Sequence, residues 1–173
     1  INLFNFMDGL DGLLSGCTLL ILSRSIYAIS PELSILFGSL FVFFIFNWSP
    51  AKIFMGDTGS TFLGGIYFII LLNSSNFYGF FINLLISTPL LVDSLTCVFV
   101  RLFKKQNIFE PHKKHLYQRL NQAGLKHSTV SMIYIFATLF LVVFSTFNNM
   151  LYLITACIAV VLVGFYLNSK YAI

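Results

Sequence analysis

The stretch VSMIYIFATLFLVVFSTF, residues 130–147, decides the fold class of this 173-residue chain. It carries no charged side chain over a length that reaches the minimum of about 17 residues for a membrane-spanning helix. A second apolar run, Leu151–Leu167, follows almost at once. Of the whole chain, 58% is hydrophobic and 9% is charged, whereas soluble domains carry about 25% charged residues. A core of this size cannot hide so much apolar surface, so the sequence predicts an integral membrane protein.

Six apolar runs of this kind alternate with polar segments. They are Gly9–Ile29, Leu33–Phe46, Ser60–Leu72, Tyr78–Phe103, Val130–Phe147 and Leu151–Leu167. The second and third are short for a span, so we expect them to extend into their polar flanks. The runs lack the polar and apolar alternation of a lipid-facing barrel, which favours helices. We expect one all-α, polytopic transmembrane domain over residues 1–173, with about six spanning helices.

Basic residues gather between the fourth and fifth runs. This segment contains Arg101, Lys104, Lys105, Lys113, Lys114, Arg119 and Lys126. The positive-inside rule puts it in the cytoplasm, and counting spans puts Lys52 and the N-terminal acidic residues on the same side. The net charge of +4 therefore collects at one face. Such a face suits anionic lipid or a phosphorylated substrate, and nucleic acid is a poor partner because no soluble basic domain exists.

The first polar cluster is NLFNFMDGLDG, residues 2–12. Asp8 and Asp11 are three positions apart, so on a helix they would share a face. The glycine after each allows a ligand to approach the backbone closely. Together with Asn5, the two carboxylates could hold a cation or hydrogen-bond a polar ligand. The alternative is that they only cap the first helix.

The second cluster is AKIFMGDTGSTFLGG, residues 51–65, a polar, glycine-rich turn between two apolar runs. Backbone amides at a helix start form a concavity that binds anions. A carboxylate there repels phosphate unless a divalent cation lies between them, which makes Asp57 a candidate metal ligand. Helix capping is again the alternative, and Thr58 or Ser60 would suffice for it.

The third cluster is FEPHKKHLYQRL, residues 109–120. Its histidines and basic residues suit contact with a diphosphate. His115 and Arg119 have the i, i+4 spacing of one helix face. The alternative is a positive cytoplasmic loop that touches lipid headgroups.

Two titratable residues stand apart from these clusters. Asp93 lies inside the fourth apolar run, where an ionisable side chain is functional by default. A structural hydrogen bond to a neighbouring helix is the alternative. His127, near the fifth run, is expected to be interfacial only.

The three clusters resemble, in this order, the polyprenyl-phosphate N-acetylhexosamine-1-phosphate transferases. The matching motifs are NFMDGLDGLLSG at 5–16, PAKIFMGDTGSTFLGG at 50–65 and HLYQRLNQAG at 115–124. That family includes the phospho-MurNAc-pentapeptide translocase and the enzymes that start O-antigen synthesis. The resemblance implies a polytopic enzyme of the bacterial inner membrane with its active site on the cytoplasmic face. Such an enzyme transfers a sugar 1-phosphate from a UDP-N-acetylhexosamine to undecaprenyl phosphate, releases UMP and needs Mg2+ or Mn2+.

The resemblance also implies roles for individual residues. Asp57 would bind the metal, and Asp8, Asp11 and His115 would join it in catalysis, with Asp11 close to the uracil. The expected nucleotide-binding and substrate-binding residues are Asn5, Gly9, Leu10, Asp11, Asn47, His112, Lys113 and Arg119.

Two departures from the family pattern bear on these roles. The upstream Asp-Asp pair of the family is missing, so we expect the chain to be the C-terminal part of a longer protein and inactive alone. The histidine motif reads His115-Leu116-Tyr117-Gln118. This HxYQ form is similar to the O-antigen branch that handles 6-deoxy-N-acetylhexosamines such as FucNAc or QuiNAc.

The rival function is an ion-coupled membrane transporter. Asp93 and the broken apolar pattern around Pro50 would then mark an ion path. A transporter needs polar groups along a path at mid-depth, whereas an interfacial enzyme needs them at one face. The topology count puts all three clusters at one face and therefore favours the transferase. The resemblance leaves room for a homodimer.

Overall fold

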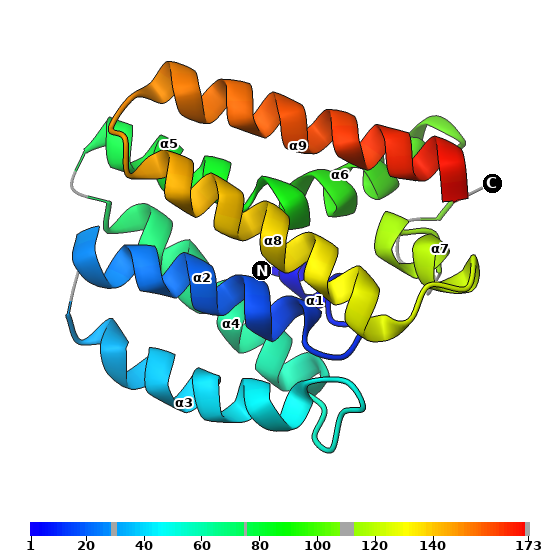
Figure 1. Cartoon of the computed structure of the whole chain (residues 1–173), viewed down its shortest axis with the longest axis horizontal. Coiled ribbons are helices and arrows are strands. Elements are labelled where there is room, and N and C mark those ends of the chain that lie inside the picture. The colour runs from blue at the N-terminus through cyan, green and yellow to red at the C-terminus, as the bar shows by residue number, and fades with distance from the viewer. Residues whose placement is uncertain (29–30, 75, 108–112, 172–173) are drawn as a thin grey trace.

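The computed structural model describes residues 1–28, 31–74, 76–107 and 113–171, which form a helical bundle (Figure 1). Within these ranges the backbone forms no strand, so the all-α prediction is confirmed. The candidate residue His112 lies outside the described residues. The helices are α1 (Asn2–Asn5), α2 (Leu13–Ala28), α3 (Leu33–Asn47), α4 (Gly56–Leu72), α5 (Phe77–Ile86), α6 (Thr88–Phe103), α7 (Leu116–Gln122), α8 (His127–Ser145) and α9 (Met150–Tyr171).

The six predicted apolar runs correspond to helical segments of the bundle. Among the described helices, α8 and α9 are long and apolar enough to cross a membrane. The pair α5 and α6 makes a third span if it is counted as one, while α2, α3 and α4 are apolar but shorter. The polytopic class is confirmed. Fewer helices than the expected six reach full spanning length.

The fourth run, expected as one span, is two helices. The axes of α5 and α6 meet at an angle of 74° at Ser87. Pro89 stands in the first turn of α6, where a missing N–H is tolerated. The hydroxyl of Ser87 donates to the carbonyls of Asn83 and Leu84, at 3.1 and 2.9 Å. These bonds satisfy backbone groups that the break would otherwise leave without partners in an apolar setting.

Helix α2 lies at the centre of the bundle, between α3 and α8 (Figure 1). Its residues Leu13, Leu14 and Ile21 are buried. The absence of a side chain at Gly16 allows α8 to come close, because a Cβ there would lie 2.4 Å from Cδ1 of Ile135. The core therefore depends on small residues as well as on large apolar ones.

The outer surface of the bundle is rich in apolar side chains. Phe77 and Phe103 are 79% and 86% exposed, and Ile35 is 77% exposed. A water-soluble protein rarely carries so much exposed apolar surface. These side chains are suitably placed to contact lipid.

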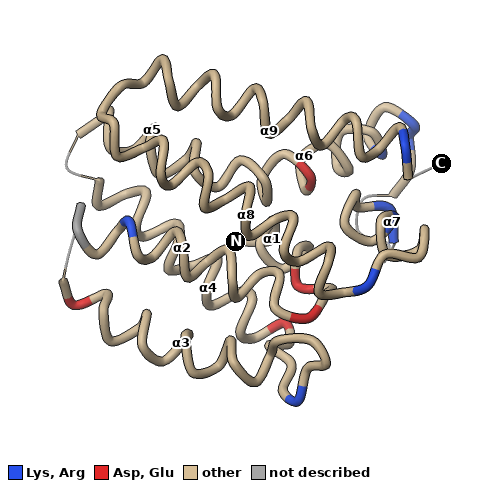
Figure 2. The backbone as a smooth tube through the Cα atoms, viewed as in Figure 1, with Lys and Arg blue, Asp and Glu red and all other residues tan. Residues whose placement is uncertain are grey.

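Charged side chains are distributed unevenly along the bundle. Lys and Arg gather mainly at the end where α7 lies (Figure 2). The loops that join α1 to α2, α3 to α4 and α7 to α8 meet at this same end (Figure 1). The described parts of the three sequence clusters are therefore brought to one end of the molecule.

Candidate active site

Asp57 stands in the first turn of α4, where its side chain is exposed. Gly56 has a positive φ of 66°, which lets the preceding loop turn directly into the helix. No side-chain hydrogen bond caps α4 among the described residues, so capping does not account for this carboxylate. A negative charge in a first helical turn is favoured by the helix dipole.

Asn5 brings the N-terminal cluster to Asp57. Its Nδ2 donates to Oδ1 of Asp57 at 3.5 Å, across 52 positions of sequence. The contact depends on the packing of α1 against α4, where a Cβ on Gly64 would lie 2.8 Å from the carbonyl oxygen of Ile1. A small residue at this point of α4 thus sets the distance between two parts of the site.

Asp8 is half-buried beside this pair. Burial, and then the nearby charge of Asp57, raises the pKa of Asp8 from 3.8 to about 7. Two carboxylates in such proximity resist ionising together. The expectation that Asp8 and Asp11 share a helix face is wrong, because residues 6–12 form a loop and α2 begins at Leu13.

Asp11 ties three parts of the bundle together. Its Oδ2 accepts a hydrogen bond from the amide of Ala51 at 3.3 Å, and its Oδ1 lies 3.3 Å from Nδ1 of His127. Its carbonyl accepts from the hydroxyl of Ser131 at 2.7 Å. His127 therefore contacts the site, and its expected role as a purely interfacial residue is incomplete.

Asn47 is buried and joins α2 to the loop before α4. Its Oδ1 accepts from the amide of Gly12 at 3.1 Å and from the hydroxyl of Ser15 at 2.7 Å. Its Nδ2 donates to the carbonyl of Ile53 at 2.9 Å. The side chain fixes the walls of the site, and its contact with a nucleoside stays a prediction.

Tyr117 connects α7 to the N-terminal loop. Its hydroxyl donates to the carbonyl of Phe6 at 2.9 Å, and burial together with nearby carboxylates raises its pKa. The neutral phenol therefore persists as a hydrogen-bond donor. Gly9 is in direct contact with it, because a Cβ there would lie 2.2 Å from the phenolic oxygen. Leu10, the next residue, is buried.

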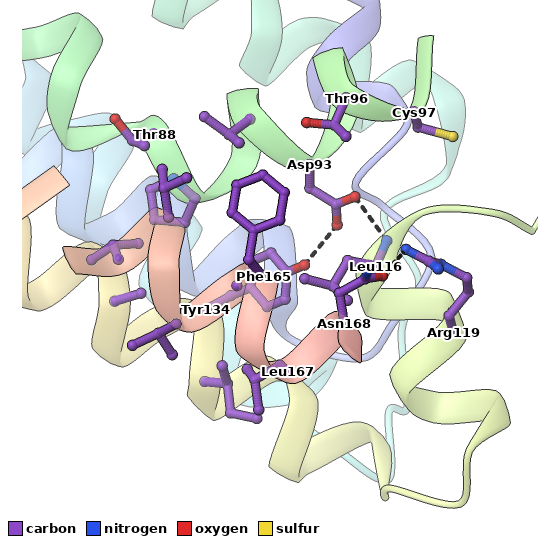
Figure 3. A pocket seen from close by; sticks show the side chains of 18 of the residues that line it. Thr88, Asp93, Thr96, Cys97, Leu116, Arg119, Tyr134, Phe165, Leu167 and Asn168 are labelled. Carbon is purple, nitrogen blue, oxygen red and sulfur yellow. Dashed lines mark hydrogen bonds between the residues drawn. The ribbon is translucent and has the colours of Figure 1, made fainter. Parts of the chain in front are cut away.

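Asp93 holds the start of α7 (Figure 3). Its carboxylate accepts from the amides of Leu116 and Tyr117 at 2.8 and 3.2 Å and from the hydroxyl of Tyr134 at 2.6 Å. Amide donors at a helix start are those that a capping carboxylate satisfies. Of the two interpretations of Asp93, the structure supports a hydrogen bond to a neighbouring helix.

His115 is the residue before α7 and is only 2% exposed. Its Nδ1 lies 3.6 Å from Oδ1 of Asp93, and its ring stacks on Tyr117 with centroids 5.7 Å apart. The ring also approaches Phe6, with centroids at 5.9 Å. His115 thus lies between the N-terminal loop and α6.

The basic residues near α7 point in different directions. Arg119 donates from Nη2 to Oδ1 of Asn168 on α9 (Figure 3). Lys113 is exposed, and Lys114 donates from Nζ to Oε1 of Gln106 at 2.7 Å. The described part of the chain therefore does not bring Arg119 together with His115 on one open surface.

A divalent cation would find only part of its ligand set here. Among the described residues, no three His, Cys, Asp or Glu side chains come close enough to hold a metal by themselves. Asp57 and Asp8 nevertheless offer two carboxylates, and Asn5 adds an amide. Mg2+ commonly binds through one or two carboxylates and completes its shell with water and substrate phosphates. The donor set fits such a cation.

Part of the chain resembles a known protein family. Residues 1–75, which contain the Asn5–Asp57 contact, match the family described as glycosyl transferase family 4. The similarity to glycosyl transferase family 4 thus lies in the N-terminal part of the chain. No solved structure matched the chain.

The relatives of this chain carry related names. It is 36% identical to the probable undecaprenyl-phosphate N-acetylglucosaminyl 1-phosphate transferase of Bacillus subtilis, over 80% of this chain and 42% of the relative. It is 38% identical to the phospho-N-acetylmuramoyl-pentapeptide-transferase of Dictyoglomus thermophilum, over 62% of this chain and 37% of the relative. The chain therefore spans less than half the length of these relatives.

Two contacts of the candidate site were not recognised from the sequence. Tyr117 was noted as part of the basic cluster and of the HxYQ motif, but its hydrogen bond to the carbonyl of Phe6 was not predicted. The contact of His127 with Asp11 had no local signal, since it arises from the packing of α8 against α2.

Proposed function

We propose that the protein transfers a sugar 1-phosphate of the N-acetylhexosamine type from a UDP-sugar to undecaprenyl phosphate and releases UMP. The observation that carries this proposal is the meeting of Asp57 with Asn5 and Asp8 at one end of a membrane bundle. The names of the Bacillus and Dictyoglomus relatives, both of them phosphate-linked sugar transferases, support it.

In the proposed reaction, an oxygen of the lipid phosphate forms a bond to the β-phosphorus of the UDP-sugar. The bond from that phosphorus to the oxygen bridging the α-phosphate breaks, and UMP leaves with the electron pair. A phosphate monoester is already largely ionised near pH 7, so no strong base is needed. The task of the protein is to position two anions and to offset their charge.

We propose that Asp57 binds Mg2+ or Mn2+, with Asp8 and Asn5 beside it. A bound cation would neutralise charge on the diphosphate and on the departing UMP. Asp8 would be ionised beside a bound cation, because the positive charge offsets the burial and the nearby Asp57 charge that raise its pKa. Asn5 would hold the side chain of Asp57 in place.

The other candidates divide into binding and positioning roles. We propose that Asp11, Gly9 and Leu10 line the nucleoside part of the site, with Asn47 fixing its wall. Lys113, which is exposed, would meet the diphosphate. His115, the residue before α7, would take part in catalysis. Arg119 of α7 and His112 would bind the substrate. An assay that compares UDP-GlcNAc, UDP-FucNAc and UDP-QuiNAc as substrates would identify the donor sugar.

The transporter alternative loses its main support. It rested on Asp93 as an intramembrane charge on an ion path. The carboxylate of Asp93 accepts hydrogen bonds from Leu116, Tyr117 and Tyr134, and these contacts give it a structural task. The polar contacts described above also lie mainly at one end of the bundle.

The test is UMP release by the complete gene product in membranes, compared with an Asp57→Asn variant. We expect the variant to insert normally and to lose at least about a hundredfold in rate, since a cation-assisted transfer loses several kcal/mol of charge stabilisation. Glu32→Gln, a carboxylate-to-amide change at the start of α3, is the matched control and should keep full activity. Asp57→Asn with near wild-type activity would overturn the assignment.

A further inference from the structure

A large cavity lies between α6, α8 and α9, beside α7 (Figure 3). Its volume is about 820 Å3, and apolar side chains make up most of its lining. They include Val92 of α6, Phe136 of α8 and Val163 of α9. The latter two are 62% and 54% exposed, so the cavity opens to the outside between membrane helices.

The charged residues of the lining are mostly basic. Four cationic side chains and one carboxylate border the cavity: Arg101, Lys104, Lys114, Arg119 and Asp93. They come from α6, the segment after it and α7, at the end of the bundle where basic residues gather (Figure 2). The charge of Asp93 is already engaged with α7 and Tyr134. The cavity is thus apolar along the helices and positive at one end.

The cavity is separate from the carboxylate site. Asp57, Asp8 and Asn5 are not among its lining residues in the described part of the chain. Asp93 and Tyr117 stand between the two, since Asp93 lines the cavity while Tyr117 reaches the carbonyl of Phe6. Of the described residues proposed to bind substrate, Arg119 alone lines the cavity. A lipid phosphate there would not meet Asp57, Asp8 or Asn5, the groups proposed to hold the cation, so its occupant is not the acceptor.

We propose that this cavity binds an anionic glycerophospholipid of the surrounding membrane. One acyl chain lies between α6, α8 and α9, and the phosphate meets the basic end near Lys104 and Arg119. Basic pockets between membrane helices on the cytoplasmic side are suited to anionic headgroups, and the bilayer supplies the lipid laterally. The inference goes beyond the proposed transfer and does not depend on it.

Occupancy of the cavity has a structural consequence for α7. Leu116 and Arg119 both line the cavity, and Arg119 joins α7 to Asn168 of α9. A bound lipid phosphate therefore adds a contact to the helix that follows His115. We expect amide hydrogen exchange of α7 to slow when the lipid is bound.

The test is native mass spectrometry of the complete gene product with phosphatidylglycerol or phosphatidylcholine of the same acyl chains. We expect preferential retention of phosphatidylglycerol by more than tenfold, at about fivefold for each basic residue that meets the headgroup. Val163→Trp fills the cavity and should lower retention at least tenfold. Leu162→Trp is the matched control, because Leu162 is 61% exposed on α9 but does not line the cavity, and it should retain the lipid.

A second pair of variants tests the headgroup and stays informative if the tryptophan variants fail to fold. Lys104→Gln should lower the preference for phosphatidylglycerol about fivefold, whereas the neighbouring Lys105→Gln should leave it unchanged, since only Lys104 lines the cavity. Equal retention of the two phospholipids would overturn the proposal. So would equal losses in both members of either pair, or displacement of phosphatidylglycerol by undecaprenyl phosphate at equal concentration.

Discussion

Gly9 is the residue at which the N-terminal loop and α7 come closest. The phenolic oxygen of Tyr117 occupies the space of a side chain at Gly9, at 2.2 Å from an added Cβ. Tyr117 is only 1% exposed, so its ring has little room to move. Any movement away from Gly9 would also break its hydrogen bond to the carbonyl of Phe6. The two sequence motifs therefore depend on one another sterically.

Gly9→Ala should destabilise the protein by about 1–3 kcal/mol, as overpacking of a closed site does. The measurement is the free energy or midpoint of unfolding in detergent. Gly65→Ala is the matched control, because an added Cβ at Gly65 meets nothing within 4 Å. That variant should be neutral or slightly more stable, since alanine favours α-helix. A Gly9→Ala protein as stable as Gly65→Ala would contradict the packing described for Tyr117.

Asp8 should give the protein a characteristic dependence on pH. Its pKa is about 7 in the folded state and about 4 when unfolded, so the folded state binds more protons between these values. Stability in metal-free buffer should therefore fall as pH rises from about 4 to about 7 and stay constant above. The difference in unfolding midpoint between wild type and Asp8→Asn isolates this contribution.

The charge of Asp57 causes part of the rise in the pKa of Asp8, and this provides an internal control. In an Asp57→Asn background, the contribution of Asp8 should shrink, because one of its two causes is gone. A contribution of Asp8 that has the same size in the wild-type and Asp57→Asn backgrounds would show that the two carboxylates do not interact.

The first turn of helix α7 is attached to the bundle by hydrogen bonds to one carboxylate. Asp93 of α6 accepts from the amides of Leu116 and Tyr117, and Tyr134 of α8 donates to the same carboxylate. An intramembrane carboxylate is thus used to hold a helix of only seven residues. Short helices of this kind are marginal without such contacts.

Asp93→Ala should loosen α7, because two amides lose their acceptor at about 1–3 kcal/mol each when they stay buried. We expect faster hydrogen exchange of α7 amides and unchanged exchange in α2. Tyr134→Phe is the control, since it removes one donor and leaves both amide bonds to Asp93 intact. If α7 exchanges at the wild-type rate in Asp93→Ala, the carboxylate does not hold it.

The helices were predictable because an apolar run of spanning length leaves the backbone few alternatives in lipid. The break at Ser87 was not predictable, because it depends on hydrogen bonds from the serine hydroxyl that replace backbone hydrogen bonds. The loop at Asp8 was mistaken for helix because i, i+3 spacing carries no information on where α2 begins. The contact between His127 and Asp11 was not predictable either, because it arises from the packing of helices that are distant in sequence.

The position of Asp57 relative to Asp8 was partly predictable. Counting spans put both on one face before any contact was known. The distance between them depends on close packing of α1 on α4 at Gly64, which the sequence showed only as one glycine among several.

The arrangement of loops across the bundle predicts a sidedness in the membrane. The end with α7 should face the cytoplasm, and the loop between α8 and α9 should face outward. Lys113→Cys and Asn149→Cys, both at exposed positions, test this with an impermeant maleimide. In intact spheroplasts only the Asn149→Cys protein should be labelled, and after lysis both should be. Labelling of Lys113→Cys in intact spheroplasts would contradict the predicted orientation.

The account centres on one claim, that the N-terminal loop and the MGDTGS turn form a single cation site. The most direct measurement is Mn2+ binding to the complete gene product, followed by electron paramagnetic resonance. The account predicts that Asp57→Asn and Asp8→Asn each weaken binding at least about tenfold, while Glu32→Gln binds as wild type. Wild-type Mn2+ affinity in both Asp57→Asn and Asp8→Asn would contradict it.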